Sequence, residues 1–161
     1  MQEPHKKNPD YEWYLDGAIN FEPGISCRLK CPACWRAWNA DTLKADTQAG
    51  KRKNLKFEDV KIILDTFGKI DACGNMSDPI YWPHFEQMLE HTLKLNWQEL
   101  HIHTNGSGKK LDWWRNIFQK VVDYRKINER KEDMIVWYFA LDGLPEESHK
   151  YRINQDGRQV W

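Results

Sequence analysis

The chain has 161 residues, of which 30% are charged and 13% aromatic, and its 24 basic residues are balanced by 24 acidic ones. This length fits one domain with a single core, and the balanced charge argues against nucleic acid or a membrane surface as a partner. Since no run of 18 apolar residues occurs and the N-terminus is too polar for a signal peptide, we expect a cytoplasmic protein. Residues 1–14 are predicted to form a polar arm.

Strand and helix signals alternate after the arm. A short strand is predicted at 17–21, followed by Pro23-Gly24 and a loop rich in cysteine. Residues 37–54 are polar and predict either a long connection or a weak helix. Their basic run, 51–53, is interpreted as a solvated surface loop in preference to a lid over the active site.

Three apolar stripes with helical spacing follow, and strands are predicted between them at 69–73 and 99–103. Gly68 is expected to close the first helix, and Asp112 to cap the third at its N-terminus. The stripes consist of Phe57, Val60, Ile63, Leu64 and Phe67; of Phe85, Met88, Leu89, Thr92 and Leu93; and of Trp114, Ile117, Phe118, Val121 and Val122.

Residues 134–141 form an almost unbroken apolar run, which is typical of a strand buried on both faces of a parallel sheet. The alternation of strands and helices predicts an α/β domain with a parallel sheet. In such folds the chemistry gathers in the loops at the carboxyl ends of the strands. We therefore expect the loops after the four predicted strands to form one site.

Three cysteines, Cys27, Cys31 and Cys34, lie in one short segment with the spacing C-x3-C-x2-C. In a chain without an export signal this grouping indicates metal binding rather than disulfides. A four-iron, four-sulfur cluster normally takes four cysteines, so three would leave one iron open to a further ligand. The alternative is a zinc site, which needs a fourth ligand such as Cys73, His5 or His84, none of them at a usual zinc-finger spacing.

The cysteine segment resembles that of the radical S-adenosylmethionine superfamily, and three further segments resemble its motifs in the expected order. They are 74–79, 101–107 and 140–143, the last followed by Arg152. The resemblance covers about residues 15 to 154. It implies that residues 15–161 form a core of this family: a partial (βα)6 TIM-like barrel with about four βα units, incomplete at its C-terminus.

The resemblance implies that the three cysteines hold a [4Fe-4S] cluster whose open iron binds S-adenosylmethionine. The glycine-rich segment would accept hydrogen bonds from the ammonium group of this cofactor, and Arg152 would pair with its carboxylate. Two positions depart from the family: Ala33 replaces an aromatic residue that touches adenine, a contact for which Trp35 or another aromatic residue would substitute, and Ala140 replaces a serine. The implied cofactor-binding residues are Gly74, Asn75, Met76, Ser77, Asp78, Asn105, Asp142 and Arg152.

The function implied by the resemblance is reductive cleavage of S-adenosylmethionine to a 5′-deoxyadenosyl radical. This radical would abstract hydrogen from an unknown substrate, a peptide, a protein or a small molecule. A one-electron donor such as flavodoxin or ferredoxin would be the partner. The alternatives are a non-catalytic zinc- or cluster-binding module and one half of a two-chain scaffold. Residue by residue, Asn105-Gly106 is interpreted as a turn, His103 as a hydrogen-bonded core or rim residue and Cys73 as a small buried side chain.

Overall fold

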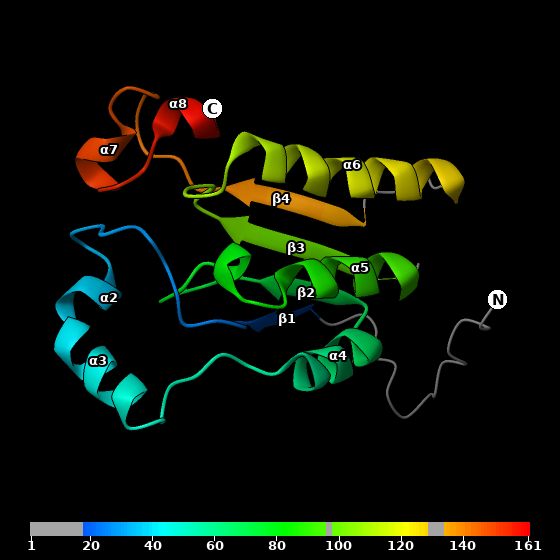
Figure 1. Cartoon of the computed structure of the whole chain (residues 1–161), viewed down its shortest axis with the longest axis horizontal. Coiled ribbons are helices and arrows are strands. Elements are labelled where there is room, and N and C mark those ends of the chain that lie inside the picture. The colour runs from blue at the N-terminus through cyan, green and yellow to red at the C-terminus, as the bar shows by residue number, and fades with distance from the viewer. Residues whose placement is uncertain (1–17, 96–97, 129–133) are drawn as a thin grey trace.

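A four-stranded parallel sheet forms the centre of the computed structural model, which describes residues 18–95, 98–128 and 134–161 (Figure 1). The predicted arm at 1–14 and the first residue of the predicted strand 17–21 lie outside the described residues. The strands are adjacent in sequence order, and each pairs in parallel with the next. They are β1 (Ala18–Phe21), β2 (Lys69–Ala72), β3 (Glu99–Thr104) and β4 (Ile135–Phe139).

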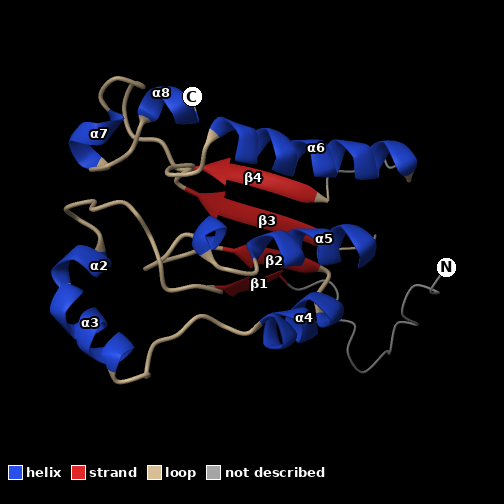
Figure 2. Cartoon of the chain, viewed as in Figure 1, coloured by secondary structure: helices blue, strands red, loops and turns tan. Residues whose placement is uncertain are grey.

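The three long helices that connect the strands lie side by side on one face of the sheet (Figure 2). These are α4 (Phe57–Thr66), α5 (Phe85–Leu95) and α6 (Leu111–Ile127). The prediction of an α/β domain with a parallel sheet is therefore confirmed. Shorter helices lie toward the carboxyl ends of the strands: α2 (Trp35–Trp38), α3 (Ala40–Gln48), the 3-10 helix η2 (Pro79–Tyr81), α7 (Ser148–Tyr151) and α8 (Gly157–Val160).

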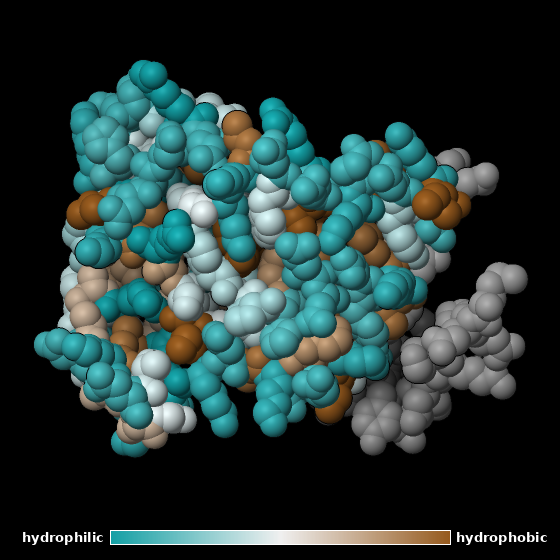
Figure 3. Space-filling model, in the orientation of Figure 1, coloured by the Kyte–Doolittle hydropathy of each residue, from teal (hydrophilic) through white to brown (hydrophobic). Residues whose placement is uncertain are grey.

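The core lies between the sheet and this helix layer, because side chains alternate between the two faces of a strand. Ile70 and Ala72 of β2 and Leu100 and Ile102 of β3 point to the helices and are fully buried. The predicted helical stripes supply most of the other half of the core, except Phe118 and Val122 of α6, which are 38% and 41% exposed. The outward faces of the helices are mostly hydrophilic (Figure 3). The opposite face of the sheet is formed by the alternate residues, which are largely polar.

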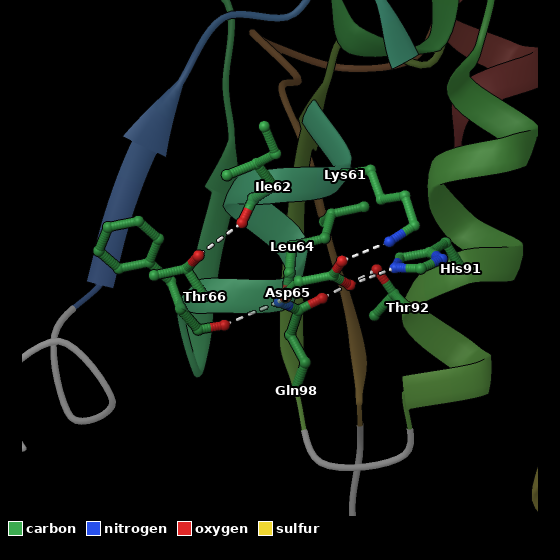
Figure 4. A network of polar contacts seen from close by, with 9 residues as sticks. Lys61, Ile62, Leu64, Asp65, Thr66, His91, Thr92 and Gln98 are labelled. Atoms are coloured by element: carbon green, nitrogen blue, oxygen red, sulfur yellow. Dashed lines mark hydrogen bonds and ion pairs between the residues drawn. The ribbon is translucent and has the colours of Figure 1, made fainter. Parts of the chain in front are cut away.

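The end of α4 is fixed to the start of β3 by a buried glutamine (Figure 4). Gln98 Nε2 donates to the carbonyls of Leu64, at 2.5 Å, and Phe67, at 2.7 Å, which the helix end leaves without helical partners. Beside it, Asp65 accepts hydrogen bonds from Lys61 and His91. Burial raises the pKa of the Asp65 carboxyl, but these two hydrogen bonds outweigh burial and hold the pKa below its usual value.

The fourth strand differs from its prediction. Of β4, only Ile135 is buried, whereas Tyr138 is 45% and Phe139 36% exposed. Within the described residues β4 pairs with β3 alone, so it lies at the edge of the sheet. One side of it packs on α6 through Trp137 and Trp114, and the other side belongs to the polar face. An apolar run therefore indicated a strand correctly, but not burial on both faces.

Of two smaller predictions, the cap of α6 is corrected, and one of the two alternatives for the segment 37–54 agrees with the structure. The N-cap of α6 is Lys110, and Asp112 lies in the first turn of the helix, where it pairs with Arg115 at 2.9 Å. An acidic residue is favourable anywhere in a first turn, so its presence marks the helix start without identifying the cap. Part of the polar segment 37–54 forms α3, in agreement with the weak-helix alternative, and the basic run 51–53 is a loop.

Candidate cofactor site

A cavity of about 420 Å³ lies at the carboxyl ends of the strands. The loops that follow all four strands contribute to its wall, as predicted, because parallel strands end at the same edge of the sheet. Figure 3 shows the surface hollowed between the α2–α3 segment and α7. The lining residues used below are Cys27, Cys31, Cys34, Arg36, Cys73, Gly74, Asn75, Met76, Ser77, Asp78, His103, Asn105, Tyr138, Phe139, Tyr151 and Arg152.

The cysteine loop brings its three thiols to this one cavity. The backbone N–H of Cys34 donates to the carbonyl of Cys31 at 3.1 Å, which forms a turn, and α2 begins directly after Cys34. All three cysteines are free and half-buried. Burial raises the pKa of the Cys27 and Cys31 thiols, while the nearby charges of Arg36 and Arg152 oppose the rise, and a bound metal ion would favour the thiolates further.

Arg36, a residue that sequence analysis did not single out, joins the cysteine loop to the segment 74–78. Its Nη1 donates to the carbonyls of Ile25 and Met76, each at 2.8 Å. Glu22 accepts from the backbone N–H of Met76 at 2.9 Å and strengthens the same link. The available signal was a cation two residues after the last cysteine, but its partners are backbone carbonyls, which carry no sequence signature.

The segment 74–78 turns so tightly that only glycine fits at its start. A Cβ added at Gly74 would lie 2.0 Å from the carbonyl oxygen of Ser77. The Ser77 hydroxyl is buried in the cavity wall and, among the described residues, has no hydrogen-bond partner. A buried polar atom without a partner is costly, so this hydroxyl is suited to bind a ligand.

Asp78 is 3% exposed, and its carboxylate is occupied by the donors of the chain itself. Oδ1 accepts from the N–H of Ile80 at 3.2 Å and from the Thr104 hydroxyl at 2.8 Å, and Oδ2 accepts from the N–H of Asn105 at 2.8 Å. Burial raises the pKa of this carboxyl, while the hydrogen bonds from Asn105 and Thr104 oppose the rise. Asp78 thus joins η2 to the end of β3, and its contact with a cofactor ammonium group stays a prediction.

Asn105 connects the end of β3 to the cysteine loop. Its Nδ2 lies 3.5 Å from Cys27 Sγ, and its Oδ1 accepts from the N–H of Ser107 at 3.0 Å. Gly106 has a φ of +70°, so Asn105-Gly106 is the predicted turn. A hydrogen bond to a cysteine sulfur is one of the ways in which a protein adjusts an iron–sulfur centre, which makes Asn105 a residue of interest for such a centre.

Arg152 lines the cavity, whereas Asp142 lies beside it. Their side chains form an ion pair through Arg152 Nε and Asp142 Oδ2. The Arg152 side chain is 20% exposed. A guanidinium that lines the cavity is suited to a carboxylate, and Asp142 orients it.

The structure separates the two aromatic alternatives and corrects the burial predicted for Cys73. Trp35 is 50% exposed and is absent from the cavity wall, where Tyr138, Phe139 and Tyr151 lie instead. Cys73 is half-buried and lines the cavity rather than the core. Of the other suggested zinc ligands, His84 contacts Gln87 away from the cavity, and His5 lies outside the described residues.

Comparisons with protein-family models, with curated proteins and with solved structures found no match. Across residues 18–95, 98–128 and 134–161, no helix combines the length and apolar character that crossing a bilayer requires. Functional conclusions therefore rest on the cavity and its residues.

Proposed function

We propose that this chain forms the core of a radical S-adenosylmethionine enzyme, with its sheet as four strands of a (βα)6 barrel. Cys27, Cys31 and Cys34 would hold a [4Fe-4S] cluster, and the segment 74–78 with Arg152 would hold S-adenosylmethionine. The substrate would be a peptide, a protein or a small molecule, and the electron donor a flavodoxin or ferredoxin. Because such a cluster needs reduced thiols, a reducing compartment such as the cytoplasm suits this function.

The proposal is supported most by the convergence of three thiols with an unpartnered hydroxyl and a guanidinium around one cavity. Three soft thiolates suit iron, and the Ser77 hydroxyl and Arg152 suit the polar end of an amino-acid cofactor. The volume of about 420 Å³ lies in the range of small-molecule sites. The thiols alone are compatible with an iron–sulfur cluster and with zinc. The Ser77 hydroxyl and the Arg152 guanidinium favour the enzyme, because they suit the cofactor and a zinc site does not need them.

The residues of the chain would bind the cofactor, orient it and shield it from water. Arg152, positioned by Asp142, would hold a carboxylate, and the tight Gly74 turn would bring backbone carbonyls close to an ammonium group. Asn105 would donate to a cysteine sulfur, and Tyr138 and Tyr151 would exclude water. A cluster held by the three cysteines would supply the single electron for cleaving the sulfonium carbon–sulfur bond of S-adenosylmethionine, and the later hydrogen abstraction would be the chemistry of the cofactor.

The test is anaerobic reconstitution of the full chain with iron and sulfide, followed by dithionite and S-adenosylmethionine. We expect brown protein and the release of 5′-deoxyadenosine and methionine, measured by chromatography. Cys31→Ala should abolish iron binding and product, whereas Cys73→Ala should retain both. Well-reconstituted brown protein that forms no 5′-deoxyadenosine would contradict the enzyme and leave only cluster binding.

A second candidate, a non-catalytic zinc site, is favoured by one observation: Cys73 lines the same cavity as the other three thiols. Four thiolates make a closed structural zinc site. It predicts colourless protein with one zinc per chain and loss of this zinc in Cys73→Ala as well as in Cys31→Ala. Metal analysis of the two variants side by side therefore separates the candidates.

A further inference from the structure

The polar face of the sheet carries a group of two histidines and one aspartate apart from the cysteines. His101 and His103 are two residues apart on β3, so their side chains point to the same face. Asp71 is the register partner of His101 on the neighbouring strand β2, about 4.8 Å away in a parallel sheet. Strand geometry alone therefore brings these three side chains together.

The distances within the group match those between ligands of one metal ion. Asp71 Oδ1 lies 3.0 Å from His101 Nδ1 and 3.4 Å from His103 Nε2, and the three ligand atoms lie within 4.8 Å of one another. With metal–ligand bonds of about 2.1 Å, neighbouring ligands are about 3.0 Å apart in octahedral and about 3.4 Å apart in tetrahedral coordination. Two of the three separations thus match adjacent positions around one ion, and the third is at most 4.8 Å.

The surroundings of His101 point independently to a cation. Its Nε2 contacts the carboxylate of Glu99, an arrangement that favours the neutral tautomer with the ring proton on Nε2. In the neutral ring, Nδ1 is then a bare acceptor that faces another acceptor, Asp71 Oδ1. Two acceptors at 3.0 Å repel each other unless a cation lies between them. A carboxylate on the far nitrogen is also the usual partner of a metal-binding histidine.

The position of His103 connects the group to the cavity. Its ring stacks on that of Tyr138, with centroids 4.5 Å apart and planes within 9°, which fixes its orientation. Both residues line the cavity described above. Two imidazoles and one carboxylate leave coordination positions open, where a metal ion binds water or an oxygen of a molecule in the cavity.

We propose that Asp71, His101 and His103 form a binding site for a divalent first-row transition metal ion, with zinc or iron(II) as the fitting ions. Glu99 orients His101 from the far side, and Lys69, 3.7 Å from Glu99, orients Glu99 in turn. The site is independent of the cysteines, so it stands whether or not they hold an iron–sulfur cluster.

The test uses the full chain with Cys27→Ser, Cys31→Ser and Cys34→Ser, so that the cysteine loop cannot bind metal and failure of the cluster proposal does not affect the result. We expect one zinc ion per chain in a competition titration with a chelator. Zinc at about 100 times its Kd should raise the thermal midpoint of unfolding by about 5–10 °C. Cobalt(II) in place of zinc should give an absorption spectrum of nitrogen and oxygen ligands.

Variants of the group then test the ligands. Asp71→Asn and His103→Ala should each weaken zinc binding more than about 100-fold, and Glu99→Gln about 10–100-fold. His149→Ala, at an exposed histidine of α7, is the matched control and should leave the affinity unchanged. Circular dichroism verifies folding, and Glu99→Gln, at a 42% exposed side chain, serves as the second variant if the others unfold.

Absence of zinc binding in the chain with Cys27, Cys31 and Cys34 replaced would overturn the proposal and would indicate instead that His101 bridges Asp71 and Glu99 by hydrogen bonds alone. Undiminished binding in Asp71→Asn or His103→Ala would overturn it equally, because the ion would then lie elsewhere.

Discussion

Asp78→Asn tests whether this carboxylate serves the fold rather than a bound ligand. The substitution preserves shape but replaces one oxygen by an NH₂ group. If the amide keeps its oxygen at Oδ1, the NH₂ group faces the N–H of Asn105; if it flips, the NH₂ group faces the N–H of Ile80. In either orientation one buried backbone N–H loses its acceptor.

The expected loss in the free energy of unfolding follows from this one unpaired N–H group. One buried donor without an acceptor costs about 1–3 kcal/mol, and hydrogen bonds to a charged group are at the stronger end of the range. We therefore expect Asp78→Asn to lower the free energy of unfolding by about 2 kcal/mol. For a chain of this size that corresponds to a fall of about 4–8 °C in the thermal midpoint.

The assay is urea unfolding of the metal-free chain followed by circular dichroism, with Asp112→Asn as the control, since Asp112 is 85% exposed. The urea midpoint should fall for Asp78→Asn with the slope of the transition unchanged, whereas the control, which loses one exposed first-turn charge, should lose at most about 0.5 kcal/mol. Hydrogen exchange should show faster exchange at the amide of Asn105 or Ile80. If Asp78→Asn is as stable as the control, the chain's own donors do not depend on the carboxylate, and our reasoning is refuted.

The other predictions concern a surface carboxylate and the cavity turn. The pKa of Asp65 is lowered in the folded state, so its ionisation stabilises the fold above pH 3.8. This stabilisation is lost as the pH falls through the folded-state pKa. Asp65→Asn should therefore lower the free energy of unfolding by about 0.5–1 kcal/mol at pH 6 and by less below pH 3.8. Equal effects in urea unfolding at pH 6 and pH 3 would contradict this. Gly74→Ala should force the turn open, cost about 1–3 kcal/mol and weaken binding of S-adenosylmethionine in equilibrium dialysis. A variant with unchanged stability and binding would argue against the tight turn.

The sequence was sufficient to predict the helices and strands and the edge of the sheet at which the four loops meet. The stripe containing Val60 and Leu64 and the alternation of strands with helices predict one sheet covered by helices, and parallel pairing then places the four loops together. Local pattern also sufficed for the turn at Gly106, whose positive φ requires glycine or a similar residue.

Contacts across distant segments were beyond such reasoning. The Asp71–His101 pair depends on the register of two strands 30 residues apart in sequence, and the Arg36 contacts depend on backbone carbonyls. The exposure of Tyr138 depends on which strand lies at the sheet edge, which an apolar run does not encode. The pattern His-x-His on a strand was the one visible signal for the histidine pair.

In β3, fold stability and surface chemistry are assigned to alternate positions. Leu100 and Ile102 contact the helices, while His101 and His103 project from the other side of the same six-residue strand. Evolution or design can therefore exchange the imidazoles for other polar groups and give the polar face of the sheet a new reactivity. The core between the sheet and the helices need not change.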